Sequence, residues 1–173
     1  KDIAVSVDRR GVQIQRVGVK DLHVPMQVRE SQGDFQHVLG NVTLSVELPH
    51  HYRGTHLSRL VETVFQWRNK PLSGHELKQI LLEVRRKLDA ERAHMTVKFK
   101  YFLTKSAPVS HSESALDYDC EFSGSIGNDG FDFILGVEVP VTTLCPCSKE
   151  ISEYGAHNQR GIIRTRVRCA RDR

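Results

Sequence analysis

The sequence has no long hydrophobic run, few cysteines and no low-complexity segment. No window holds the about 18 consecutive apolar residues that a membrane-spanning helix needs, and no secretory leader is visible, so we expect no membrane association. Four cysteines in 173 residues are too few and too unevenly spaced for a disulfide scaffold. We therefore expect a cytoplasmic protein with an ordinary hydrophobic core, which a chain of this length can bury.

Positive charge is in only small excess, since the formal net charge is +4. Basic and aromatic residues are not interleaved as in proteins that stack single-stranded bases, so we predict no nucleic-acid binding. A phosphorylated small molecule fits the uneven charge as well as nucleic acid does. Much of the excess lies in arginines of the last fourteen positions: Arg160, Arg164, Arg166, Arg168, Arg171 and Arg173.

Hydrophobic periodicity predicts strands, then two consecutive helices, then strands again. Helical spacing covers 57–69 and 73–88, and Ser73 with Glu76 forms a capping box that begins the second helix. This order predicts an α+β domain with both helices on one face of an antiparallel sheet. The expected strands cover 22–28, 42–48, 95–101, 116–122, 131–141 and 163–169.

Alternation also assigns side chains to the two faces of these strands. Cys120 and Cys169 fall on apolar sides and are predicted to be buried small hydrophobes. The other side of the last strand carries Arg164, Arg166 and Arg168. An open strand face with this much charge suggests a covered or shared surface, so we expect an oligomer.

The segment VPVTTLCPCSKEISEYGAHNQRG, residues 139–161, is polar and contains two cysteines on either side of Pro146. A bond between Cys145 and Cys147 would close a strained ring. One of these thiolates together with His157 suits zinc or another divalent transition metal, with room left for water. Two other interpretations stay open: a nucleophilic cysteine with His157 as its base, or one packed and one exposed thiol without a catalytic part.

The segment GTHLSR, residues 54–59, lies where a strand gives way to a helix. Free backbone amides and the helix dipole favour anions at such a junction. His56, Ser58 and Arg59 are therefore candidates to hold a phosphate or carboxylate. The alternative is a plain helix cap with a solvated arginine.

Together these segments resemble the signatures of type IB GTP cyclohydrolases, the alternative enzymes for the first step of folate synthesis. The resemblance is carried, in the family's order, by VELPHHYRGTHLSRLVE, SHSESALDYDCEF and GVEVPVTTLCPCSKEISEYGAHNQRG. It implies a tunnelling fold, in which the sheets of several subunits form a β-barrel, and a homotetramer with active sites between subunits. It also implies two-module subunits, so that residues 1–173 would be one such region, the first module plus the start of a second that continues beyond Arg173.

The resemblance further implies ligands and a reaction. Cys145 and His157 match two ligands of a divalent metal, zinc in some members with manganese or iron tolerated in others. Further ligands and a glutamate that holds the guanine would lie beyond Arg173. GTP would be hydrolysed to 7,8-dihydroneopterin triphosphate and formate, beginning with addition of metal-activated water to carbon 8 of the guanine. For substrate binding we predict His56, Ser58, Arg59 and Arg160, with the two arginines at the triphosphate.

Two other functions remain compatible with these residues. An archaeal-type relative acts on the same substrate and yields a cyclic phosphate product. A non-catalytic metal- or nucleotide-binding module would use the same cysteine and histidine without turnover. Product analysis separates these possibilities.

Overall fold

The computed structural model of the chain describes residues 14–30, 33–48 and 54–169. Within these ranges it confirms an α+β arrangement built on one six-stranded sheet. The strands are β1 (Ile14–Arg29), β2 (Phe35–Leu48), β3 (Ala93–Ser106), β4 (Glu113–Gly127), β5 (Gly130–Leu144) and β6 (Asn158–Arg168). The helices are α1 (Leu57–Trp67), α2 (Gly74–Leu88) and α3 (Pro146–Ile151).

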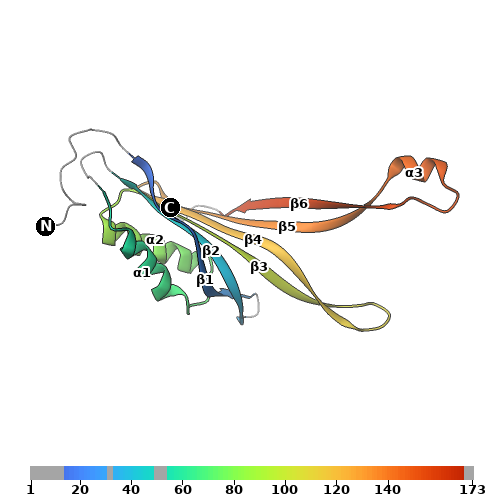
Figure 1. The fold of residues 1–173 in the computed structure, drawn as a ribbon, viewed down its shortest axis with the longest axis horizontal. Coiled ribbons are helices and arrows are strands. Elements are labelled where there is room, and N and C mark those ends of the chain that lie inside the picture. Colours follow the sequence, from blue (N-terminus) through green and yellow to red (C-terminus); the bar gives the residue numbers. More distant parts are fainter. Residues whose placement is uncertain (1–13, 31–32, 49–53, 170–173) are drawn as a thin grey trace.

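The sheet is an antiparallel meander in which the strands lie in chain order. At one end α1 and α2 lie side by side on one face of the sheet (Figure 1). The ladder between β4 and β5 runs from the pair Gly127–Gly130 to the pair Asp119–Glu138. Beyond it, β3–β4 and β5–β6 separate into two ribbons, and the β5–β6 ribbon leads to α3 (Figure 1).

The core lies between the two helices and the sheet. Leu60 and Val64 of α1 are buried, and α2 presents a longer apolar stripe. Burying one such side chain stabilises the fold by roughly 1.5–3 kcal/mol. The stripe of α2 comes close to β4, where a Cβ on Gly124 would lie 2.1 Å from Cδ2 of Leu77. The buried residues of α2 are Leu77, Ile80, Leu81 and Val84.

Helix α2 begins as the sequence predicted, with one difference in the cap. The hydroxyl oxygen of Ser73 accepts the backbone N–H of His75 at 3.2 Å. The same hydroxyl donates to the carboxylate of Glu76, whereas a full capping box would pair that carboxylate with a backbone amide. The helix ends at Asp89, which has a left-handed backbone with φ of 49°.

The strands extend beyond their predicted limits. Strand β1 begins at Ile14, before the predicted range 22–28, and β3 continues to Ser106, past the predicted 95–101. The added part of β3 pairs with β4 out to Ser106–Glu113. Its last residues are exposed on both faces, so the alternation that marks a half-buried strand is absent there. Cross-strand hydrogen bonds, rather than burial, set these limits.

Two expectations about individual segments were wrong. Cys169 is exposed, because the neighbouring strand β6 is an edge strand whose residues are almost all exposed. The polar segment 145–157, for which the sequence indicated no helix, contains α3. The prediction for Cys120 is confirmed in part, since it is half-buried and packs against the core.

Three arginines of β6, Arg164, Arg166 and Arg168, have carboxylate partners within the chain. The distances from guanidinium nitrogen to carboxylate oxygen are 2.8 Å for Arg164–Glu138 and 2.9 Å for Arg166–Glu121. Such exposed pairs contribute little to stability, but they neutralise the charge locally. These three arginines therefore do not by themselves require another subunit.

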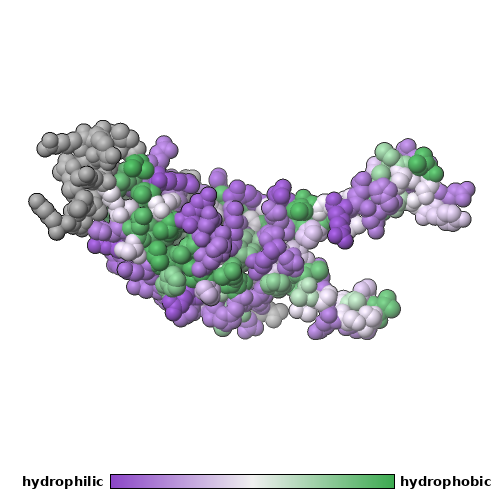
Figure 2. All heavy atoms as spheres, viewed as in Figure 1, coloured by the Kyte–Doolittle hydropathy of each residue, from purple (hydrophilic) through white to green (hydrophobic). Residues whose placement is uncertain are grey.

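Apolar side chains gather at two kinds of place on the surface (Figure 2). One is the junction of helices and sheet, and the other is the far end of each ribbon. At the ribbon ends Val109, Ile151 and Tyr154 are 90%, 88% and 98% exposed. Among the helices in the described ranges, none has both the length and the apolar character needed to span a membrane.

Candidate active site at the end of the β5–β6 ribbon

Cys145 and His157 lie next to each other at the end of the β5–β6 ribbon. The last ladder pair of the ribbon is Leu144–Asn158. The backbone N–H of Cys145 donates to the carbonyl oxygen of His157 at 3.2 Å, which continues the antiparallel register by one pair. Residues directly opposite each other on such a pair have Cβ atoms about 4.5–5.5 Å apart, with both side chains on one face. The hairpin therefore brings the two predicted ligands together.

Helix α3 places backbone amides beside the sulfur of Cys145. Cys145 is the N-cap of α3, Pro146 follows in its first turn, and the carbonyl oxygen of Cys145 accepts the N–H of Lys149 at 3.2 Å. The backbone N–H of Ser148, followed by that of Cys147, lowers the pKa of the Cys145 thiol. The sulfur makes no capping hydrogen bond of regular geometry. A thiolate is the form that binds metals and attacks electrophiles.

The imidazole of His157 is oriented by its neighbours. Its Nδ1 lies 3.3 Å from the carbonyl oxygen of Asn158, a contact that favours the tautomer with the proton on Nδ1. The lone pair of Nε2 is then available to a ligand or a proton. The backbone N–H of His157 donates to Oγ of Ser148 at 3.1 Å. Both the backbone N–H and the ring of His157 thus have a polar partner.

The donor set fits a borderline-soft divalent cation. A thiolate and a neutral imidazole are typical ligands of zinc. In the part of the chain that the structure describes, no group of three or more histidine, cysteine, aspartate or glutamate side chains gathers to hold a metal. Cys145 and His157 are therefore two donors, fewer than the four of a structural zinc site. Cys145 and Cys147 are both free thiols.

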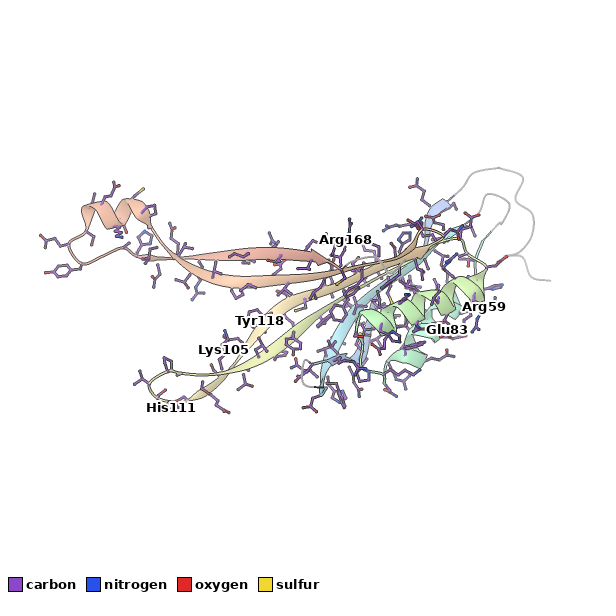
Figure 3. All side chains as sticks on the ribbon, turned by 180° about the vertical axis from the view of Figure 1, so that it is seen from behind. Arg59, Glu83, Lys105, His111, Tyr118 and Arg168 are labelled. Carbon is purple, nitrogen blue, oxygen red and sulfur yellow. The ribbon has the colours of Figure 1, made fainter. Side chains whose placement is uncertain are left out.

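The residues predicted near α1 lie elsewhere. His56 is the N-cap of α1 and makes no side-chain capping hydrogen bond. Ser58 is exposed on the first turn of the helix. Nη1 of Arg59 donates to the carbonyl oxygen of Lys87 at 3.1 Å, so this arginine is held at the end of α2 (Figure 3). Helices α1 and α3 lie at opposite ends of the molecule (Figure 1), and one chain does not bring these residues to Cys145 and His157.

Arg160 is close to His157 in sequence but lies on the other face of the ribbon. It pairs with Thr142 in the β5–β6 ladder. Because side chains alternate along a strand, a residue three positions after His157 points to the opposite face. There it lines an open groove of about 660 Å³ together with Ile162 and Arg164.

The comparison with known families covers the whole chain. Residues 1–173 match a family model described as "GCHY-1: Type I GTP cyclohydrolase folE2". The chain belongs to this FolE2 family. The family that the sequence motifs resembled is therefore confirmed. The subtype label IB was wrong, since the description of the matching family reads type I.

Curated FolE2 proteins give the same result. GTP cyclohydrolase FolE2 of Citrifermentans bemidjiense is 46% identical over 167 residues, which cover 96% of this chain and 62% of that protein. The FolE2 of Geobacter sulfurreducens is 46% identical over 169 residues, with 98% and 65% covered. The FolE2 of Syntrophus aciditrophicus is 47% identical over 167 residues, with 96% and 65% covered. The chain thus spans 62–65% of the length of these relatives.

Sequence reasoning missed one residue of this FolE2 chain that lies at the candidate site. Ser148 is in the first turn of α3 and contacts His157 through its hydroxyl. A signal for it existed, because Pro146 after Cys145 is typical of the first position of a helix. A helix that begins after Cys145 would place Ser148 in its first turn, close to Cys145.

Proposed function

We propose that this chain carries part of the active site of a cytoplasmic GTP cyclohydrolase. The reaction is hydrolysis of GTP to 7,8-dihydroneopterin triphosphate and formate, the first step of tetrahydrofolate biosynthesis. The observation that carries the proposal is the adjacent placement of Cys145 and His157 in a chain that matches the FolE2 family over residues 1–173. The names of the curated relatives support the same activity.

In this proposal Cys145 and His157 are the catalytic residues and would hold a divalent metal, zinc, manganese or iron. When bound, such a metal supplies the Lewis acidity that addition of water to carbon 8 of the guanine needs at neutral pH. The amides of Ser148 and Cys147 favour the thiolate form of Cys145. The contact between Nδ1 and the carbonyl oxygen of Asn158 leaves Nε2 of His157 as the donor.

We also propose that the protein assembles as a homotetramer of the tunnelling-fold type, with active sites between subunits. The separation of α1 from α3 supports this arrangement, because His56, Ser58 and Arg59 can reach a Cys145–His157 pair only if it belongs to another subunit. The exposed apolar ribbon ends, with Val109 and Tyr154, also fit contacts between subunits. Arg59 and Arg160 would bind the triphosphate. Residues 1–173 would form the first module and the start of the second.

The experiment that tests the function is a turnover assay. The full-length protein is incubated with GTP and a divalent metal, and formate and the fluorescent pterin formed by oxidation are measured. We expect both products from the wild type and from a Cys169→Ser control, because that exposed thiol lies outside the site. Cys145→Ala and His157→Ala should abolish turnover. A cyclic phosphate product would favour the archaeal-type reaction, and absence of formate would favour a binding module.

A further inference from the structure

Ser148 lies between the two members of the candidate site. Its hydroxyl oxygen accepts the backbone N–H of His157 at 3.1 Å, nine positions along the chain. Ser148 also lies in the first turn of α3, which begins at its N-cap Cys145, and the carbonyl oxygen of Cys145 accepts the N–H of Lys149 at 3.2 Å across this turn. Ser148 therefore links the turn that begins at Cys145 to the backbone of His157.

The contacts of Ser148 complete the anchoring of His157. The carbonyl oxygen of His157 accepts the N–H of Cys145 at 3.2 Å, and its N–H donates to Ser148. Both backbone groups of this residue are thus bound to the Cys145–Ser148 turn. The third contact, from Nδ1 to Asn158, sets the plane of the ring. A change in the Ser148 contact would shift the imidazole relative to the sulfur.

Hydrophobic packing of α3 does not hold His157 in place relative to Cys145. None of the six residues of α3 is buried, and the loop that returns to β6 is largely exposed, with Tyr154 98% accessible. A ligand pair at the end of an exposed ribbon keeps its geometry only if hydrogen bonds define it. Residues that orient metal ligands in this way tune affinity although they do not touch the metal.

We propose that Ser148 is a positioning residue that holds Cys145 and His157 at the spacing needed to share one cation. This inference rests on the proposed function, since it assumes that these two residues are ligands. Loss of an outer partner of a metal ligand typically weakens metal binding by roughly 10–100-fold. We expect Ser148→Ala to weaken binding within that range.

The chain offers a matched control in the same loop. Oγ of Ser152 accepts the N–H of Tyr154 at 3.3 Å, so it is also a serine bound to a backbone amide, but its contact involves neither Cys145 nor His157. Ser148→Thr keeps the hydroxyl and serves as the conservative variant. Because α3 has no buried residue, all three substitutions should leave the thermal unfolding midpoint unchanged.

The test is a titration of the full-length protein with Co²⁺, in which the sulfur-to-cobalt charge-transfer absorption reports the thiolate ligand and competition with a chelator gives the affinity. We expect Ser148→Ala to bind Co²⁺ at least about tenfold more weakly, and Ser148→Thr and Ser152→Ala to match the wild type. Equal affinity for Ser148→Ala and the wild type would overturn the inference. So would an equal loss in Ser152→Ala, or a threonine variant as weak as the alanine variant.

A further variant separates this inference from the function on which it rests. Cys145→Ser should remove the charge-transfer absorption. If it leaves absorption and affinity unchanged, the metal site itself is refuted. If it removes the absorption while Ser148→Ala behaves as wild type, the metal site stands and only the role of Ser148 is refuted.

Discussion

Gly124 is the position where the packing of α2 on the sheet can be tested most sharply. A Cβ at this residue of β4 would lie 2.1 Å from Cδ2 of Leu77, 3.2 Å from Cε2 of Phe131 and 3.3 Å from Cδ1 of Leu81. Separations below 3.0 Å do not occur between real Cβ atoms and their neighbours, so Leu77 would have to move. Leu77 is completely buried, so it would have to move within the packed core.

The expected cost of Gly124→Ala follows from this clash. Overpacking a close-packed core typically destabilises a protein by about 1–3 kcal/mol. Replacing a glycine by alanine also restricts the unfolded chain, which stabilises by about 0.4–1 kcal/mol where the site tolerates a side chain. The packing effect is larger, so Gly124→Ala should lower the free energy of unfolding by roughly 1–2 kcal/mol.

The measurement is urea unfolding followed by circular dichroism, with Gly161→Ala as the control. A Cβ on Gly161 would meet only Cγ2 of Val141 at 3.5 Å, an ordinary van der Waals contact. The control should therefore be neutral or slightly stabilising. If Gly124→Ala proves as stable as Gly161→Ala, the close approach of α2 to β4 is incorrect.

Further predictions concern the start of α2 and the pH dependence of stability. Ser73→Ala removes the acceptor for the N–H of His75 and should cost about 0.5–2 kcal/mol in urea unfolding; an unchanged free energy of unfolding would argue against the cap. Partial burial, followed by the nearby Arg16, lowers the pKa of His94. The folded state then binds fewer protons than the unfolded state, so stability should fall as the pH drops below about 6.5. His94→Gln should reduce this slope in thermal unfolding scans between pH 7 and 5, and an identical slope would contradict the assignment.

The fold class was predictable because most strands are half-buried. Alternation over 42–48 and 95–101 marks strands with one face against the core, and the stripe of α2 gives a clear helical period. The strand ends were not predictable in the same way. Residues of β3 beyond Phe102 are exposed on both faces, so they join the ladder without any hydrophobic pattern.

The candidate site was predictable only in part. The pairing of Cys145 with His157 follows from a hairpin that continues one pair beyond its ladder. Helix α3 has no buried face, so hydrophobic periodicity could not find it. The position of Arg59 at the far end of the molecule from α3 depends on how the whole sheet is built, which local patterns do not encode.

The central claim is that one cation is shared by the sulfur of Cys145 and the imidazole of His157. Metal analysis of the purified full-length protein beside its Cys145→Ser variant tests it most directly. We expect a divalent metal in the wild type and a large loss of that metal in the variant. Equal metal content in the two proteins would contradict it.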